Sequence, residues 1–183
     1  MICLCSSSNT RALLLNKFNI DFFQKSPDYD EDKISTDNAK RFVYTASLGK
    51  LEAGVKEFGL KIPLLCADTV IASSSGKILR KAQNIENARE ILNMQSGSKI
   101  SIISSLHYKS ENILFSNIST TNYHFYEFDR DDLERYLKSG LWQGKAGGCM
   151  VEGFCKKYIK SVDGLESNAM GLQVEVILPW LKY

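Results

Sequence analysis

The fold is decided by a ten-residue stretch, PLLCADTVIA (residues 63–72). A short and nearly continuous apolar run, bounded by turn residues, predicts a strand that is buried on at least one face. Asp68 lies inside the run, where a carboxylate is costly unless it is ion-paired, hydrogen-bonded or bound to a metal. Burial also raises the pKa of a carboxyl group toward the range that suits a general base, so Asp68 is the first candidate functional residue. The alternative is an aspartate that only pins a neighbouring loop by hydrogen bonds.

Segments on both sides of this strand alternate between strand and helix patterns. Before it we expect strands at 2–5 and 20–23, a helix at 11–18, a polar loop at 24–37, and a long helix that Thr36 or Asp37 caps and that ends near Phe58. After it we expect a hairpin to 78–79, helices at 84–94 and 129–137, strands at 99–107 and 117–128, a glycine-rich loop at 140–153, a strand at 154–162 and a closing helix at 167–181. The fold class is therefore α/β, with a mixed sheet because hairpins interrupt the alternation of strands and helices.

The composition is that of one globular domain spanning residues 1–183, with 44% hydrophobic and 24% charged residues. The net charge of +2, without a tract that interleaves basic and aromatic residues, argues against a nucleic-acid partner. No apolar run approaches the roughly 18 residues of a membrane span, so we expect no membrane partner and a soluble, cytoplasmic protein. The five cysteines form no CxxC pair, which fits reduced thiols that pack as small core residues.

Hydroxyl and cationic groups occur at positions where a phosphate could bind. The SSSNTR stretch (residues 6–11) joins a predicted strand to a helix, and the unpaired N–H groups of a helix N-terminus attract anions. Ser8 could instead simply cap that helix. Lys50 falls in the middle of the apolar side of the long predicted helix, so either its stem passes along the core to solvent or its ammonium points into a site shared with an anion. Lys81 and Lys145 are, each taken alone, ordinary surface charges.

Taken together, these groups have the composition of a triphosphate site. Four cations could neutralise the phosphates: Arg11, Lys50, Lys81 and Lys145. Asp68 and the Asp30–Glu31 pair could hold a divalent ion, since carboxylate oxygens are ligands that Mg²⁺ prefers. The pattern has no cysteine or histidine nucleophile, and it favours metal-assisted attack of water on a phosphate.

Four motifs, in order along essentially the whole chain, resemble the signatures of the Maf family. They are LCSSSNTRALL (4–14), ADTV (67–70), KAGG leading to EG (145–153), and GLESNAMGL (164–172). The resemblance implies a Maf-like nucleoside triphosphate pyrophosphatase on the fold of the inosine triphosphate pyrophosphatases, a long twisted mixed sheet flanked by helices with two lobes around a cleft. It also implies that a nucleoside triphosphate is hydrolysed to the monophosphate and pyrophosphate with Mg²⁺ or Mn²⁺. Nucleotide house-cleaning, a link to septum formation and cell-division arrest, and a homodimer belong to the same expectation.

The resemblance also assigns roles to single residues. Asp68 would be the proton acceptor or metal-organising carboxylate, and Glu31 a metal-side acid. The phosphate side would consist of Ser8, Arg11, Lys50 and Lys81, with Lys145 in the Lys-Ala-Gly loop. Three positions would sort the family by the base of the substrate: Thr10, Thr69 and Glu152. Thr69, together with Lys145, resembles members that prefer pyrimidines such as dTTP or UTP. Glu152 resembles members that act on 7-methyl-GTP, and Thr10 matches neither type.

The chain departs from the family pattern at Asn9, Thr10 and Arg80. If these departures reflect lost turnover, the protein would be a non-catalytic nucleotide-binding regulator of septum formation. Such a regulator would bind nucleotide without releasing pyrophosphate, which separates it from the enzyme.

Overall fold

The central apolar run is strand β3 (Leu64–Ser73), and the other elements are arranged around it. The structure is a computed structural model that describes residues 1–181. Within that range β3 belongs to a seven-stranded sheet of order β2-β1-β3-β5-β6-β7, with the short β4 also paired to β3. The pairs β1–β2 and β1–β3 are parallel and the remaining pairs are antiparallel, which confirms the mixed α/β class.

The other strands are β1 (Ile2–Leu4), β2 (Phe22–Gln24), β4 (Ile78–Leu79), β5 (Lys99–Lys109), β6 (Leu114–Phe125) and β7 (Ile159–Asp163). The helices are α1 (Asn9–Lys17), α2 (Ala39–Phe58), α3 (Ile85–Gln95), α4 (Arg130–Ser139), α5 (Glu166–Ala169) and α6 (Val174–Ile177). Short 3-10 helices occupy Glu31–Lys33, Phe154–Tyr158 and Leu178–Trp180. Across residues 1–181, none of the helices combines the length and apolar character that crossing a membrane requires.

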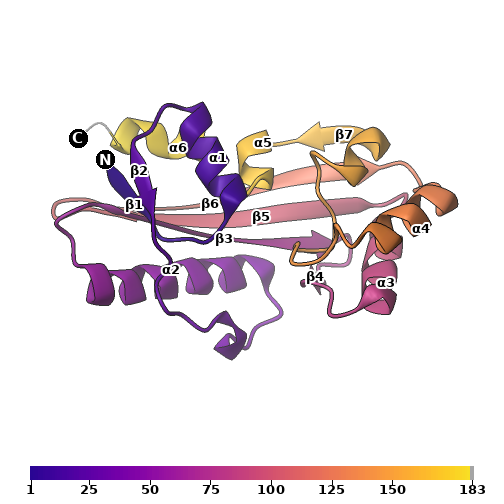
Figure 1. Cartoon of the computed structure of the whole chain (residues 1–183), viewed down its shortest axis with the longest axis horizontal. Coiled ribbons are helices and arrows are strands. Elements are labelled where there is room, and N and C mark those ends of the chain that lie inside the picture. Colours follow the sequence, from indigo (N-terminus) through magenta and orange to yellow (C-terminus); the bar gives the residue numbers. More distant parts are fainter. Residues whose placement is uncertain (182–183) are drawn as a thin grey trace.

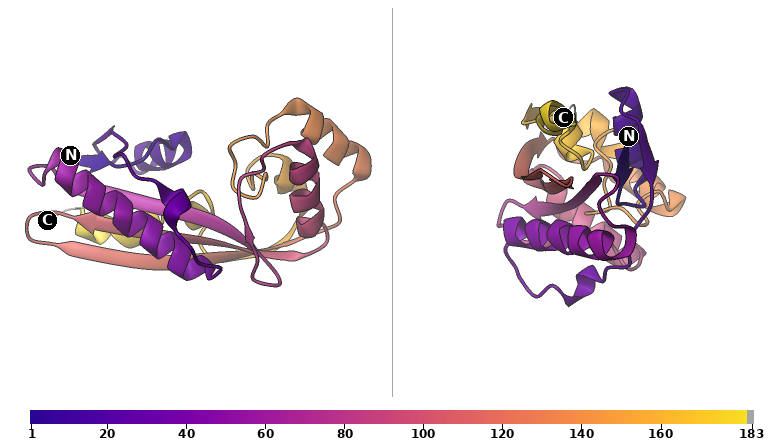
Figure 2. Two further views of the ribbon diagram at one scale, coloured as in Figure 1. Left: turned by 90° about the horizontal axis from the view of Figure 1, so that it is seen from below. Right: turned by 90° about the vertical axis from the view of Figure 1, so that its left-hand side faces the viewer.

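The molecule has two lobes that share the long strands β3, β5 and β6 (Figures 1 and 2). In the first lobe α2 covers one face of the sheet, while α1, α5 and α6 lie on the other face. The second lobe has its own apolar core, in which α3, α4 and the segment 142–158 pack on the far ends of the strands. The predicted mixed sheet, flanked by helices in two lobes, is therefore confirmed.

Three details of the predicted elements are wrong. The expected closing helix at 167–181 is divided into α5, α6 and a 3-10 turn, because Gly171 has a φ of 99°, which a continuous helix cannot accommodate. The expected strand at 154–162 starts with the 3-10 helix, so that only its second half pairs with β6. The cap of α2 is Asn38, whose side chain accepts a hydrogen bond from the backbone N–H of Arg41, and neither Thr36 nor Asp37 has this role.

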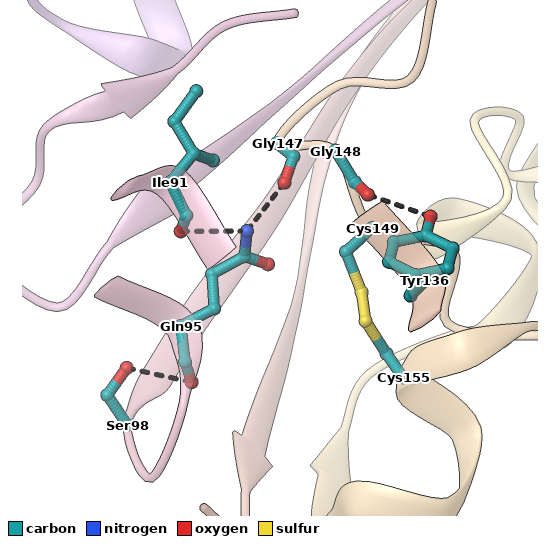
Figure 3. Close-up of a disulfide and its surroundings, with 8 residues drawn as sticks. All are labelled: Ile91, Gln95, Ser98, Tyr136, Gly147, Gly148, Cys149 and Cys155. Atoms are coloured by element: carbon teal, nitrogen blue, oxygen red, sulfur yellow. Dashed lines mark hydrogen bonds between the residues drawn. A yellow bond between two sulfur atoms is a disulfide. The ribbon is translucent and has the colours of Figure 1, made fainter. Parts of the chain in front are cut away.

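The prediction of five reduced thiols is wrong for two of them. The structure joins Cys149 and Cys155 in a disulfide, and their Cα atoms lie 6.3 Å apart, within the range that a disulfide spans. The pair lies beside a hydrogen bond from the Tyr136 hydroxyl to the Gly148 carbonyl at 2.8 Å (Figure 3). A spacing of six residues does not by itself predict a disulfide. The two cysteines meet because the chain turns between them. Three cysteines of the described chain are free and buried: Cys3, Cys5 and Cys66.

One buried imidazole in the sheet is held neutral. His107 on β5 is 1% exposed, and its Nδ1 lies 3.0 Å from the hydroxyl of Ser47 on α2. Its Nε2 has no hydrogen-bond partner among residues 1–181. Burial lowers the pKa of His107 to about 4, because the charged ring would carry an unpaired N–H in the core. In the neutral tautomer that carries its proton on Nδ1, the ring donates its one N–H to the Ser47 hydroxyl, and no N–H is left unpaired in the core.

We expect the free energy of unfolding to fall as the pH decreases from about 6.5 to about 4. In this window the unfolded chain protonates His107 and the folded chain does not, so each pH unit costs up to about 1.4 kcal/mol. Urea denaturation at several pH values, compared between the parent and His107→Asn, isolates this contribution from that of the carboxylates. The variant should show a shallower slope, and an unchanged slope would show that His107 does not titrate in this way.

Candidate active site

A stretch of unpaired edge on β3 defines the site. The parallel strand β1 ends at Leu4, opposite Leu65, and β4 joins β3 only from Ile71 onward. Residues 67–70 therefore have no strand partner on this side within the described chain. Ligands of α/β sheets bind beyond the carboxyl ends of parallel strands, and β1 ends here. Asp68 lies in the middle of the open stretch.

On the face covered by α2, Asp68 contacts a lysine that also binds a second carboxylate. Lys50 Nζ donates to Asp68 Oδ1 at 2.6 Å and to Glu31 Oε2 at 2.9 Å. Lys81 Nζ lies 4.0 Å from Glu31 Oε1 and extends the cluster toward the second lobe. The ammonium of Lys50 thus points inward, which decides between the two alternatives that the sequence left open.

The geometry of α2 explains why Lys50 reaches this point. The helix packs Phe42, Val43 and Ala46 against β3 and β5, and Lys50 follows Ala46 by four residues on the same side. Its side chain is 19% exposed, and that of Asp68 is 9% exposed. The apolar side of the helix that suggested a core position therefore also delivers a cation to the edge of the sheet.

The charged groups in this cluster shift one another's pKa values. Burial raises the pKa of Asp68, and it outweighs the opposite effect of Lys50 and Arg11. Burial also favours the neutral form of Glu31, but Lys50 and Lys81 outweigh it and hold the pKa of Glu31 below its ordinary value. For Lys50, burial favours loss of the proton, yet the two carboxylates raise its pKa above the ordinary value. Lys50 therefore stays charged, and of the two carboxylates Asp68 is the better proton acceptor.

Arg11 approaches from the opposite face of the sheet, on the first turn of α1. Its Nε donates to the Gly171 carbonyl at 2.8 Å, its Nη1 to Ser6 Oγ at 3.0 Å and its Nη2 to Thr69 Oγ1 at 3.1 Å. Ser8 is the N-cap of α1, since its hydroxyl accepts from the Arg11 backbone N–H at 3.4 Å. The capping role proposed for Ser8 from the sequence is confirmed, and a role in phosphate binding stays a prediction.

The remaining predicted residues lie at different distances from this cluster. Lys145 is half-buried and precedes Ala146, which forms an isolated bridge with Lys81, so the Lys-Ala-Gly loop reaches the site from the second lobe. Thr10 is half-buried on the first turn of α1. Glu152 is exposed in the second lobe, where burial and this carboxylate raise the pKa of Tyr136 to about 12. The structure brings Glu31, Lys50, Lys81 and Asp68 into one ion-paired cluster and places Arg11 and Thr69 beside it, and none of the ion pairs of this cluster includes Glu152.

Sequence reasoning did not identify two groups that hold Arg11. Gly171 supplies a carbonyl directly, and Ser104 hydrogen-bonds to Thr69, with its oxygen 2.8 Å from Thr69 Oγ1. Nothing in the sequence singles out Ser104, because the strand at 100–106 also contains Ser101 and Ser105. Nothing local marks the Gly171 carbonyl, because its partner is 160 positions away in the chain.

The two carboxylates are the candidate protein ligands of a divalent cation. Glu31 Oε2 and Asp68 Oδ1 both lie within 3 Å of the Lys50 ammonium, which occupies the point between them, so a divalent ion would bind beside the ammonium through the other carboxylate oxygens. In the part of the chain that the structure describes, no group of three or more histidine, cysteine or acidic side chains is suited to hold a metal. An ion held by these two acids would take its remaining ligands from phosphates and water.

Acidic and cationic side chains gathered at the end of a parallel strand are typical of α/β proteins that bind phosphorylated ligands. A family model described as "Maf-like protein" matches residues 1–183, and the chain belongs to this family. A relative from a Nitratiruptor species is 52% identical over 96% of this chain and 95% of its own length. A relative from Helicobacter pylori (strain J99) is 37% identical over 98% of this chain and 94% of its own length. Both relatives are named nucleoside triphosphate pyrophosphatase.

Two solved structures match part of the chain at much lower sequence identity. The structure of the Staphylococcus aureus Ham1 protein is 15% identical and covers 70% of this chain and 71% of its own, with a TM-score of 0.45. A nucleoside triphosphatase and dITP/XTP pyrophosphatase from Mycobacterium abscessus is 13% identical and covers 68% of this chain and 72% of its own, with a TM-score of 0.41.

We expect Lys50→Met to destabilise the fold, because it leaves Asp68 and Glu31 facing each other without a cation. The expected loss at neutral pH is about 2 kcal/mol, less than for a fully buried pair because Glu31 keeps 35% of its side chain exposed. Repulsion between the carboxylates raises the pKa of one of them in the folded variant, and stability from a raised pKa is lost as the pH rises. The deficit measured by urea denaturation should therefore be larger at pH 8 than at pH 5.

Lys56→Met is the matched control, since Lys56 is an exposed lysine on the same helix. It should change the free energy of unfolding by no more than about 0.5 kcal/mol at either pH. Equal deficits for the two variants would contradict the bridging role of Lys50.

Proposed function

We propose that this protein hydrolyses a nucleoside triphosphate to the monophosphate and pyrophosphate. The observation that carries the proposal is the Lys50 ammonium, which lies 2.6 Å from Asp68 and 2.9 Å from Glu31 at the open edge of β3. Two further cations lie beside these residues: Arg11, which contacts Thr69, and Lys81, which lies near Glu31. The names of relatives such as those from Nitratiruptor and Helicobacter pylori support the same activity.

Binding of the triphosphate would rest on the cations around the open edge. A guanidinium has five N–H donors. Among the described residues, three of those on Arg11 have protein acceptors, which leaves two for phosphate oxygens. Lys50, Lys81 and Lys145 would add charge from α2 and from the second lobe. In phosphoryl transfer the protein acts mainly by positioning and by charge stabilisation, which is what fixed cations supply.

The chemical step we propose is attack of water on the α-phosphorus. The water oxygen forms a bond to the α-phosphorus, its proton passes to Asp68, and the bond from the α-phosphorus to the bridging oxygen breaks. Pyrophosphate leaves with the electron pair, and the neighbouring cations stabilise the charge that develops on it. The raised pKa of Asp68 suits this role, because a carboxylate with a higher pKa accepts a proton more readily.

We propose Glu31 and Asp68 as the protein ligands of a Mg²⁺ or Mn²⁺ ion. When bound, such an ion would supply Lewis-acid polarisation of the phosphate oxygens. For the base we propose a pyrimidine, as in dTTP or UTP, because Thr69 contacts Arg11 beside the cluster, whereas Glu152, the position that resembles members acting on 7-methyl-GTP, is exposed in the second lobe. A role in removing surplus nucleotides would follow from this activity.

We expect Asp68→Asn to lower kcat by about 10²- to 10⁴-fold, the usual contribution of a general base. The measurement is pyrophosphate release from dTTP, UTP, CTP and 7-methyl-GTP in the presence of Mg²⁺, with Asp163→Asn, an exposed aspartate on β7, as the control. The parent and the control should turn over a pyrimidine triphosphate at similar rates, and EDTA should abolish both rates.

Other outcomes of this panel would lead to different conclusions. Parent activity in Asp68→Asn would contradict the proposed base. Nucleotide binding without pyrophosphate release in the parent would favour the non-catalytic regulator. Preference for 7-methyl-GTP would overturn the proposed pyrimidine specificity and bring Glu152 back into consideration.

A further inference from the structure

A chain of hydrogen bonds runs from Arg11 through the sheet to the segment after β7. Arg11 Nη2 lies 3.1 Å from Thr69 Oγ1, which is 2.8 Å from Ser104 Oγ, and Ser104 Oγ lies 2.9 Å from the backbone carbonyl oxygen of Asn168. Thr69 and Ser104 are direct partners in the pairing of β3 with β5. Ser104 and Asn168 are 0% exposed, whereas Thr69 and Arg11 are half-buried, so the chain leads from the site into the core.

The two ends of this chain fix the direction of every hydrogen bond in it. A guanidinium only donates and a carbonyl only accepts. The single proton of Ser104 must therefore go to Asn168, and Ser104 then accepts the proton of Thr69. Thr69 in turn presents a lone pair to Arg11. Without Ser104 the Thr69 hydroxyl would be free to rotate, and this acceptor would no longer be fixed toward the guanidinium.

The segment 168–171 holds the same guanidinium at a second point. The Gly171 carbonyl accepts from Arg11 Nε at 2.8 Å, while the Asn168 carbonyl ends the chain through Ser104. A Cβ atom at Gly171 would lie 3.2 Å from Thr69 Oγ1 and 3.3 Å from Arg11 Nε, so only glycine lets the segment approach this closely. Gln173 fixes the strand as well, because its Nε2 donates to the Ser104 carbonyl at 2.7 Å.

We propose that Ser104 is a positioning residue for nucleotide binding. It does not touch the nucleotide but orients the Thr69 hydroxyl, and through it the Arg11 guanidinium whose two remaining donors bind phosphate. This inference rests on the proposed function only in taking a nucleotide phosphate as the ligand of Arg11. The same chain of hydrogen bonds gives Thr69 a role besides any contribution to base selection.

The test is a double-mutant cycle on the affinity for a non-hydrolysable triphosphate, dUTP with an imido group between the α- and β-phosphorus, measured by calorimetry with Mg²⁺. Ser104→Ala should weaken the Kd about fivefold, the value of one hydrogen bond to a charged network. In the Thr69→Val background, where the link is already broken, the same substitution should change the Kd by less than about twofold. An equal factor in both backgrounds, or no weakening in the parent, would overturn the proposal.

Ser105→Ala is the matched control. Ser105 is also 0% exposed on β5, but its hydroxyl accepts from Ser47 on the opposite face. Any effect it has on the Kd should be the same in both backgrounds, since it is not part of the chain. If Ser104→Ala does not fold, Ser104→Cys replaces it, because a thiol of similar size is a weak donor. Coupling in the Kd without pyrophosphate release in the parent would leave this inference standing and reject the proposed hydrolysis.

Discussion

The Lys50 ammonium, held between the Asp68 and Glu31 carboxylates, is the interaction on which the account of this site depends. It pairs with two acids, one on a buried strand and one on a 3-10 helix, and it comes from a helix packed against both β3 and β5. Without it, one carboxylate would be left in an apolar strand with a remote guanidinium as compensation, which is costly. The same two ion pairs hold both acids beside one cation.

The open edge of β3 is the second requirement, and it follows from the lengths of the neighbouring strands. β1 is only three residues long and β4 only two, so neither pairs with the middle of the ten-residue β3. Side chains from the neighbouring segments can therefore lie beside this unpaired edge. The first lobe contributes Arg11, Glu31 and Lys50, and Lys81 joins them from the start of the second lobe. A site assembled from both lobes is suited to a long, highly charged ligand such as a triphosphate, because the phosphates can contact cations on both sides.

The sequence was informative where the physical signal is local. The apolar run around Asp68 gave the central strand and its costly carboxylate, and the position of Lys50 on an apolar helix face gave the two alternatives that the structure decided. Prediction failed where distant contacts or single backbone angles decide. The closing helix breaks at Gly171, whose φ of 99° serves a contact with Arg11, and Cys149 meets Cys155 through turns that have no pairing signal. Ser104 was missed because its partners are far along the chain, and its residue type alone does not distinguish it from Ser105.

The central claim is that the triphosphate binds at the open edge of β3, and a structure of the complex tests it most directly. The crystal structure of Asp68→Asn with Mg²⁺ and dUTP carrying an imido group between the α- and β-phosphorus would show where the phosphates lie. We predict phosphate oxygens within hydrogen-bond distance of Arg11 and Lys50, with the α-phosphorus facing residue 68. Phosphates bound elsewhere, for example between α4 and the 3-10 helix at Phe154–Tyr158, would contradict the account.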